Sequence, residues 1–195
     1  FAQEYARLLA SDGITLEVLP TAGSVENLEL LKKGEVSLAL IQGGRATKED
    51  KERLQSLGSL FLEPVWIFTR KQSGIKRFLE LKGKRVSVGI AGSGTHLLAT
   101  QLLSANGITE TNTQLIREET TEAIDSLSKR KIDAAFFVAS PAAPIIHELF
   151  TAPAVELLDF DRAAAYGRWF PFLTPVTLSE GVIDLQQNIP SHDTP

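Results

Sequence analysis

The chain has 195 residues, a formal net charge of −4 and a sequence pI near 5.5. Hydrophobic residues make up 43% of it and charged residues 23%, which is typical of a folded globular protein and not of a disordered one. A chain of this length buries a sizeable core; its mild acidity argues against a dedicated nucleic-acid binder, and no apolar run approaches the ~20 residues that a membrane span needs.

The sequence contains neither Cys nor Met. Without Cys there is no disulfide, no thiolate zinc site and no cysteine nucleophile, and the redox compartment stays undecided. The chain opens at Phe1 with no initiator and no apolar signal segment, and it ends at Pro195 in a polar tail. We therefore expect a piece of a longer protein, with any targeting segment outside this sequence.

In the first third of the chain the sequence predicts helices alternating with strands. Apolar residues at helical spacing favour a helix over residues 1–10, and a second helix over residues 25–33 has Ser24 as its N-cap and Gly34 just after its end. Residues 14–19 alternate like a strand, and residues 36–41 form an apolar run typical of a strand buried on both faces.

The charged residues 45–53 are predicted as a solvated helical face, and the pattern beyond them becomes strand-rich. Strands are expected over residues 57–62, 65–69, 85–90, 113–116, 132–138 and 155–160, and helices over residues 96–105, 120–128 and 141–150. The later cluster of Tyr166, Trp169 and Phe170 fits either structural packing or the wall of a ligand cleft. The alternation of strands and helices indicates an α/β fold.

Residues 24–41 and 120–137 show the same order of features. Each has a hydroxyl residue at the helix start, an acidic first turn, a short amphipathic helix, a basic exit and a strand of small apolar residues. Two interpretations stay open: any two strand–helix–strand units look alike in this way, or the chain contains two similar α/β lobes. Two lobes would place strand ends at residues 42–43 and 138–140 across a cleft, where open α/β sheets bind ligands.

A series of motifs along nearly the whole chain resembles the solute-binding proteins of TRAP transporters, TAXI class. The matching segments are 21–28 (TAGSVENL), 34–42 (GEVSLALIQ), 63–65 (EPV), 73–75 (SGI), 81–89 (LKGKRVSVG), 91–95 (AGSGT), 132–139 (IDAAFFVA) and 171–177 (PFLTPVT). Any one of these pieces alone is weak, but their occurrence in order makes the resemblance specific.

The resemblance implies a two-lobe α/β fold like that of type II periplasmic binding proteins, each lobe a mostly parallel sheet flanked by helices. It assigns residues 1–68 to lobe one, residues 69–180 to lobe two, and residues 181–195 to a tail that crosses back toward lobe one.

The sequence departs from the family's pattern in three places. The family's first strand would precede Phe1 and its return segment would follow Pro195, so lobe one is expected to be incomplete. After the Gln, Gly43-Gly44-Arg45 stands where the family usually has a small polar residue and an acid. The first two departures concern completeness, and the third concerns the class of ligand.

The loop of residues 91–95 follows a predicted strand and opens a helix. Its backbone N–H groups and the hydroxyls of Ser93 and Thr95 are suited to hold a carboxylate or a phosphate, assisted by the helix dipole. A plain tight turn with Thr95 as N-cap is the other interpretation. Gly23 and Ser24 form the matching helix start in lobe one, where ordinary capping and a binding role are compatible.

Four further residues are candidates with alternatives. Gln42 ends a predicted strand, where its amide either contacts a ligand or bonds to a neighbouring loop. Arg45 either pairs with an acidic ligand or belongs to the charged helix that follows. Phe136 and Phe137 alternate along a strand, so that one faces the core and the other either lies outside it or is also packed there; we expect core packing of both. The predicted ligand-binding residues are Gly23, Ser24, Gln42, Gly43, Gly92, Ser93, Gly94, Thr95, Phe137 and Ala139.

We expect the receptor subunit of a TRAP-type transporter, which captures a small organic acid or amino acid in an inter-lobe cleft and delivers it to the membrane permease subunits. By resemblance it acts in the periplasm or at the outer face of the cytoplasmic membrane. No cofactor, metal ion or nucleic-acid partner is expected. The alternatives are the effector-binding domain of a LysR-like transcription regulator and a membrane-tethered sensor domain.

We expect no enzymatic activity. The His residues, His96, His147 and His192, stand in no Ser-His-acid or metal-ligand spacing, and the sequence has no paired-carboxylate signature.

Overall fold

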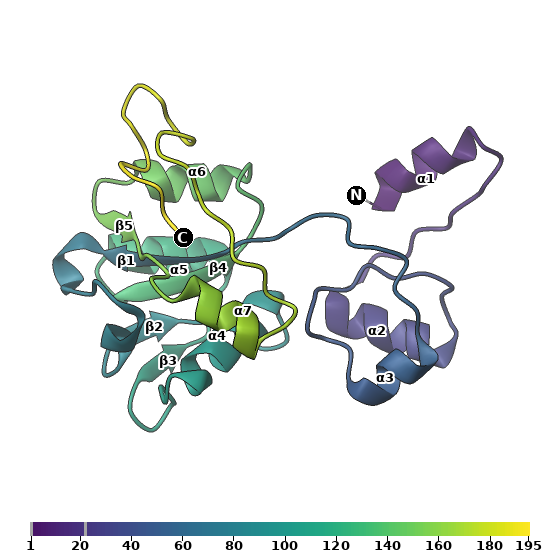
Figure 1. Cartoon of the computed structure of the whole chain (residues 1–195), viewed down its shortest axis with the longest axis horizontal. Coiled ribbons are helices and arrows are strands. Elements are labelled where there is room, and N and C mark those ends of the chain that lie inside the picture. The colour runs from purple at the N-terminus through teal and green to yellow at the C-terminus, as the bar shows by residue number, and fades with distance from the viewer. Residues whose placement is uncertain (1, 22) are drawn as a thin grey trace. The chain divides into compact units, whose positions relative to one another are not determined.

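The computed structural model describes residues 2–21 and 23–195, and the chain divides into two compact units, residues 1–57 and residues 58–195 (Figure 1). We call them unit 1 and unit 2 and describe each by itself. The boundary expected after residue 68 falls inside the first strand, β1 (Val65–Arg70), whose pairing partners are all strands of unit 2. The chain therefore enters unit 2 earlier than the sequence indicated.

The described part of unit 1 contains three helices: α1 (Ala2–Ala10), α2 (Ser24–Lys33) and α3 (Lys48–Arg53). Helix α2 ends as predicted, because Gly34 adopts a left-handed conformation (φ 74°) and its N–H meets the carbonyls of Leu30 and Leu31. Its start differs from the prediction. The N-cap is Gly23, which offers no side-chain cap, and Ser24 is already the first helical residue.

The strands predicted over residues 14–19 and 36–41 are wrong, because no strand is assigned among residues 2–21 and 23–57. In the second segment, side chains of α2 satisfy backbone groups that a neighbouring strand would otherwise pair. Asn27 Nδ2 donates to the carbonyl of Leu40 at 2.8 Å, and Ser24 Oγ accepts from the N–H of Gln42 at 2.9 Å. Leu38 and Leu40 remain exposed, contrary to a strand buried on both faces. The predicted strand over residues 57–62 is also irregular.

Unit 2 is built on a five-stranded mixed sheet, which confirms the α/β class. Beside β1 it contains β2 (Arg85–Ser87), β3 (Gln114–Ile116), β4 (Ala134–Val138) and β5 (Val155–Leu157), in the order β3-β2-β4-β1-β5. Strand β2 runs parallel to β3 and β4, whereas β1 lies antiparallel between β4 and β5 (Figure 1). Strands β2, β3 and β4 thus share one direction and present their carboxyl ends at the same edge.

Helices cover both faces of this sheet. They are α4 (Gly94–Ala105), α5 (Thr120–Ser128), α6 (Pro144–Thr151), α7 (Ala163–Trp169) and the short 3₁₀ helices η1 (Lys71–Ser73) and η2 (Phe78–Leu81). Helix α5 begins and ends at the predicted residues, while β2 and β5 are shorter than predicted. Among the described residues, no helix combines the length and apolar character needed to cross a bilayer.

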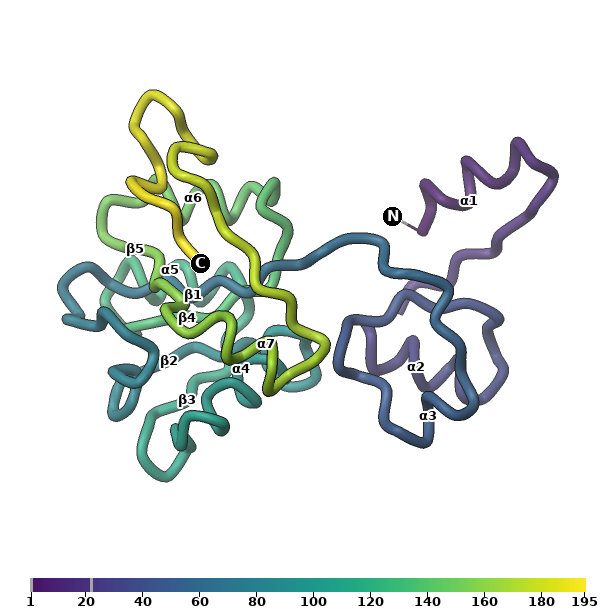
Figure 2. Tube along the Cα trace, viewed as in Figure 1, coloured from purple at the N-terminus to yellow at the C-terminus, as the bar shows by residue number. Residues whose placement is uncertain are grey.

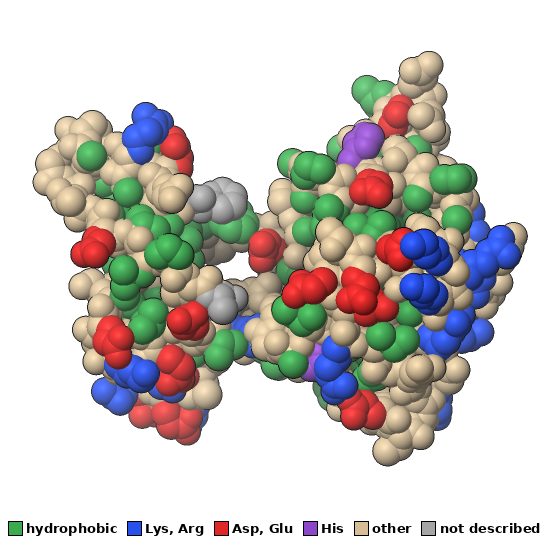
Figure 3. All heavy atoms as spheres, turned by 180° about the vertical axis from the view of Figure 1, so that it is seen from behind, with side chains coloured by type: hydrophobic (Ala, Val, Ile, Leu, Met, Phe, Trp, Pro, Cys, Tyr) green, Lys and Arg blue, Asp and Glu red, His purple; other side chains and the backbone are tan. Residues whose placement is uncertain are grey.

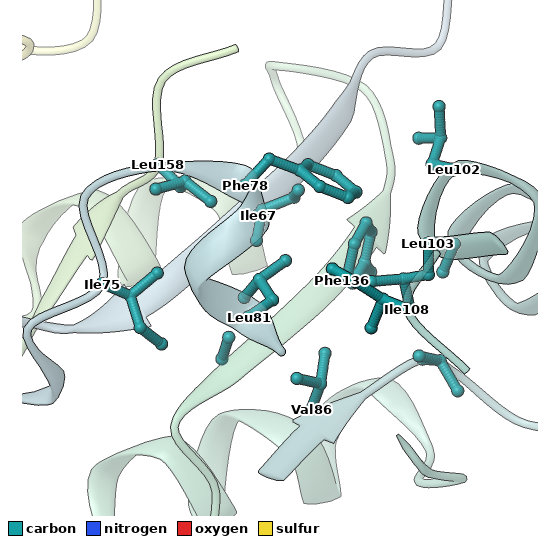
Figure 4. Packing of buried hydrophobic residues seen from close by; sticks show 13 residues of the cluster. Ile67, Ile75, Phe78, Leu81, Val86, Leu102, Leu103, Ile108, Phe136 and Leu158 are labelled. Carbon is teal, nitrogen blue, oxygen red and sulfur yellow. The ribbon is translucent and has the colours of Figure 1, made fainter. Parts of the chain in front are cut away.

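The core consists of two clusters, one on each face of the sheet. Ile67, Phe78 and Phe136 pack together in the first, beneath α4 and η2 (Figure 4). Phe68 and Phe137 belong to the second, beneath α5 and α6. Neighbouring strand residues point to opposite faces of the sheet, and a core cluster covers each face. Phe136 (2% exposed) and Phe137 (3% exposed) are therefore both buried, which confirms the expected core packing of both.

The aromatic cluster near α7 is mainly structural. Tyr166 packs against Phe78 and Phe160, with ring centroids 5.8 and 5.7 Å apart, and Phe170 packs against the first core cluster. Trp169 is 76% exposed.

The C-terminal tail returns to unit 2. Thr194 is buried and forms an antiparallel bridge with Leu178, and the carbonyl of Pro195 accepts from the N–H of Phe160 (Figure 2). The end of the chain is thus held within unit 2 by Leu178 and Phe160. The crossing of residues 181–195 toward lobe one stays a prediction.

Candidate functional site

The candidate site is a pocket of about 100 Å³ at the carboxyl ends of β2 and β3. The chain leaves β2 through a turn that opens α4, and it leaves β3 through a short segment that opens α5. The pocket is lined by Ser87, Gly89, Ile90, Ser93, Thr95, Glu118, Glu119, Thr120, Ala123, Phe136 and Phe137. Its walls thus include residues of both helix starts.

The start of α4 is fixed by Ser93. Its side chain accepts from the N–H of His96 at 3.0 Å, so Ser93 is the N-cap and Thr95 lies within the first turn. The interpretation with Thr95 as the cap is wrong, because the helix begins one residue earlier than that residue. The backbone N–H groups of the first turn have no carbonyl partner within the helix. They form the positive end of the helix dipole, which favours an anionic group.

Gly89 is required by the geometry of this turn. Its φ of 76° lies in the left-handed region, and a Cβ atom there would stand 3.0 Å from both Ser93 Oγ and Thr95 Cβ. No other residue type lets the strand approach the helix start so closely.

Two polar atoms on the pocket wall lack a partner among the described residues. Ser87 is fully buried and its Oγ has no hydrogen bond. Glu118 accepts from Ser126 Oγ through Oε1 at 2.8 Å, and its Oε2 is buried with no partner. Buried polar groups in native proteins are nearly always bonded. Two such atoms on one pocket indicate hydrogen bonds that a bound molecule would complete.

The structure brings together part of the predicted ligand-binding set. Ser93, Thr95 and Phe137 line the pocket, and Gly94 is the first residue of α4. Gly92 is exposed in the turn before them, with φ 84°.

Ala139 is held by the protein itself and does not line the pocket. Its carbonyl accepts from Trp66 Nε1 at 2.9 Å. This bond ties the end of β4 to the start of β1.

The predicted residues of unit 1 form their own local group. Gly23, Ser24 and Gln42 meet at the start of α2, where Ser24 bonds the Gln42 backbone, and Gly43 is exposed in the following turn. Arg45 precedes α3 and is partly buried, so it does not belong to the charged helix. Burial lowers the pKa of its guanidinium from the ordinary value.

Sequence reasoning missed Ser87, Gly89, Glu118 and Thr120 as wall residues. A signal existed for Glu118, since an acidic residue two positions after a strand lies near the carboxyl edge of the sheet. Ser87 is interior to a predicted strand, and no sequence pattern shows that its hydroxyl lacks a partner. Among the described residues, no three His, Cys, Asp or Glu side chains gather as a metal-ion site.

The chain belongs to the NMT1-like family, whose model matches residues 2–191. Its fold is similar to that of solved binding proteins. The GluR0 ligand-binding core from Nostoc punctiforme in complex with L-glutamate has a TM-score of 0.56 at 21% identity, and the match covers 80% of this chain and 68% of that one. An ancestral arginine-binding protein bound to arginine has a TM-score of 0.54 at 18% identity, covering 80% and 66%.

A third solved structure agrees with these two. An amino acid ABC transporter substrate-binding protein from Streptococcus pneumoniae, bound to L-arginine, has a TM-score of 0.51 at 19% identity, covering 80% of this chain and 62% of that one. The chain therefore spans about two thirds of the length of these proteins. At such identities the similarity shows the fold alone, which this chain shares with these three binding proteins.

Proposed function

We propose that the chain is the solute-binding receptor of a TRAP-type transporter of the TAXI class, which captures a small organic acid or amino acid. The observation that carries this proposal is the pocket at the start of α4, with the fully buried hydroxyl of Ser87 on its wall, which has no hydrogen-bond partner among residues 2–21 and 23–195. The NMT1-like family match and the solute-binding-protein fold support it.

A carboxylate of the ligand would bind at the first turn of α4. The backbone N–H groups there, with the hydroxyls of Ser93 and Thr95, donate to an anion, and charge-assisted bonds of this kind are about twice as strong as neutral ones. Gly89 allows this turn to stand close to the strand, so that the donors converge on one small volume.

Glu118 favours an amino acid over a dicarboxylate within this proposal. An ionised carboxylate only accepts hydrogen bonds, and the unpartnered Oε2 complements the N–H groups of an ammonium. A second ligand carboxylate beside it would be repelled. The pocket thus offers donors at α4 and an acceptor at Glu118, which matches the two charges of a zwitterion.

The proposed partners and location follow from the resemblance. The receptor would deliver its ligand to the membrane permease subunits of the transporter, in the periplasm or at the outer face of the cytoplasmic membrane. It would bind its ligand without transforming it, since binding proteins are what the chain is similar to.

A membrane-tethered sensor domain is the second candidate. The similarity to the ligand-binding core of GluR0 favours it, because that core has the highest TM-score of the three structures compared above. Both candidates predict the same ligand-binding pocket and differ in whether the bound form recognises a permease.

The test is a thermal-shift and calorimetric panel of L-glutamate, L-glutamine, L-arginine, succinate and 2-oxoglutarate. A true ligand at 100 times its Kd stabilises the protein by about 2.7 kcal/mol, which raises Tm by roughly 5–10 °C for a chain of this size. Thr95→Val should weaken binding about tenfold, whereas Thr177→Val, at an exposed threonine outside the pocket, should leave it unchanged. The proposal is contradicted if no panel member raises Tm, or if both variants weaken binding equally.

A further inference from the structure

A strongly basic surface lies at the sheet edge opposite the candidate ligand pocket. Strands β2 and β4 begin at this edge, and the antiparallel β1 ends there at Arg70. Ten of the chain's twenty Lys and Arg residues fall within residues 70–85 and 129–131, where Glu80 is the only acidic residue. Figure 3 shows Lys and Arg side chains gathered along one side of unit 2. This concentration of cations contrasts with the net charge of −4 of the whole chain.

The carboxylates near this edge are already engaged. Asp133 pairs with Arg70 and Arg85 at 2.8 Å each. Glu80, Glu156 and Asp125 each hold one cation, Arg77, Lys76 and Lys129 respectively. In the described part of the chain, Lys71 and Arg130 have no carboxylate partner. The edge therefore keeps an excess of positive charge.

These two cations line one pocket of about 150 Å³. Its other walls are Arg70, Gln72, Pro153 and Ala154, and none of the lining residues is acidic. Arg130 stands in the turn between α5 and β4 with a left-handed backbone (φ 61°), a conformation uncommon for a residue other than Gly. Arg70 contributes a buried Nε–H that has no acceptor among the described residues. Three cationic side chains thus border one hollow.

We propose that this pocket binds a small oxyanion, either inorganic phosphate or the terminal phosphate of a monoester. A water molecule takes roughly 30 Å³ of liquid, so the pocket has room for about five heavy atoms, the size of a phosphate group. Guanidinium groups match the oxygens of phosphate, and the flexible ammonium of Lys71 adds a point charge. Because all of its residues lie at the other end of the strands, the site is separate from the solute pocket.

The test is calorimetric titration of the full chain with inorganic phosphate at constant ionic strength, with chloride and sulfate as comparison anions. The expected result is saturable binding of one phosphate with a Kd of about 1 mM or lower. The double variant Lys71→Ala with Arg130→Ala should weaken it at least about tenfold. Lys131→Ala removes one charge from the same edge but outside the pocket, and should change the Kd less than about twofold.

Two titration results would overturn the proposal. One is the absence of saturable phosphate binding, and the other is equal weakening by Lys131→Ala, which would indicate a diffuse charge effect. Thr95→Val should leave phosphate binding unchanged. A failure of the phosphate-site proposal is therefore distinguishable from a failure of the proposed solute binding.

A vesicle-binding experiment distinguishes free phosphate from a lipid phosphate monoester. It compares retention of the protein by vesicles that contain phosphatidic acid with retention by vesicles of equal surface charge that contain phosphatidylglycerol. Retention by phosphatidic acid alone, lost in the double variant, supports a lipid monoester. No retention, together with phosphate binding in solution, supports free phosphate. Equal retention by both lipids, unaffected by the double variant, contradicts a phosphate-specific pocket.

Discussion

Ser126 Oγ donates a hydrogen bond of 2.8 Å to Oε1 of Glu118, which leaves Oε2 of the same carboxylate as a buried acceptor on the wall of the candidate pocket. The bond ties the segment after β3 to helix α5 and fixes the orientation of the carboxylate. One oxygen thus serves the protein, and the other is left for a bound molecule.

The first prediction concerns the charge of Glu118. Glu118→Gln keeps an oxygen that accepts from Ser126 but replaces the buried acceptor Oε2 with an NH2 group, which donates. Affinity for amino-acid ligands should fall about tenfold or more, while affinity for succinate should stay the same or rise, because the repulsion is removed. Calorimetric titration measures both. Glu122→Gln, at an exposed residue of α5 outside the pocket, should change neither affinity; a parallel loss for both ligand classes in Glu118→Gln would contradict the assigned role.

The second prediction separates stability from binding at Ser87. Replacing Ser87 with Ala removes a fully buried hydroxyl that has no partner among the described residues. The ligand-free protein should become more stable by about 1 kcal/mol in urea unfolding, and the affinity for its ligand should fall several-fold. A loss of stability with unchanged affinity would show that the hydroxyl has an internal partner and no contact with ligand.

The third prediction concerns Gly89. In Gly89→Ala the new Cβ would meet Ser93 Oγ and Thr95 Cβ at 3.0 Å on a backbone with φ 76°. We expect a loss of roughly 2–3 kcal/mol in unfolding free energy, measured by urea denaturation, together with weaker ligand binding. Gly58→Ala is the matched control, because its Cβ would meet nothing within 4 Å and its φ is not in the left-handed region. Equal effects of the two changes would argue against a close approach at Gly89.

The fourth prediction concerns acid stability. Hydrogen bonds from Arg85, and then from Arg70, hold the pKa of Asp133 well below its ordinary value. Because the folded-state pKa is lower than the unfolded one, this stabilisation is complete above about pH 4 and is lost as the pH falls through the folded-state pKa. Unfolding free energies measured between neutral pH and about pH 2 should show this decline.

Asp133→Asn tests the same interaction at neutral pH. It leaves two partly buried guanidinium groups without their counter-charge, so the unfolding free energy should drop by about 3 kcal/mol. In this variant the unfolding free energy should also fall less steeply at low pH than it does in the unchanged protein. An acid response identical to that of the unchanged protein would assign the decline to other carboxylates.

Helix ends could be predicted from the sequence because their signals are local. Gly34 ends α2 where a left-handed residue is needed, and α5 runs over Thr120–Ser128 as its hydroxyl start and apolar spacing indicate. The exceptions are the N-caps. Gly23 is the N-cap of α2 where Ser24 was expected, and Ser93 is the N-cap of α4 where Thr95 was one interpretation, because the backbone geometry of the turn decides between nearby candidates.

Strands were less predictable because a strand depends on a partner elsewhere in the chain. Val36 to Ile41 has the composition of a buried strand, yet α2 supplies hydrogen bonds to its end and no ladder forms among the described residues of unit 1. The candidate site shows the same difference between local and long-range signals. Ser93 and Thr95 were found from a local loop motif, whereas Ser87 and Glu118 reach the pocket only through the pairing of β2 with β3.

The place of β1 in the sheet sets the order in which unit 2 is completed during synthesis. It is the first strand of the sheet to leave the ribosome, yet both of its neighbours, β4 and β5, come much later in the chain. Until β4 and β5 emerge, both backbone edges of β1 are unpaired. Its apolar side chains, Trp66, Ile67 and Phe68, also lack the core that buries them in the folded protein. Pairing over such sequence separations raises the contact order and slows folding. The nascent chain therefore exposes an aggregation-prone strand for most of the time during which unit 2 is synthesised. We expect a chaperone to bind the nascent chain at this stage.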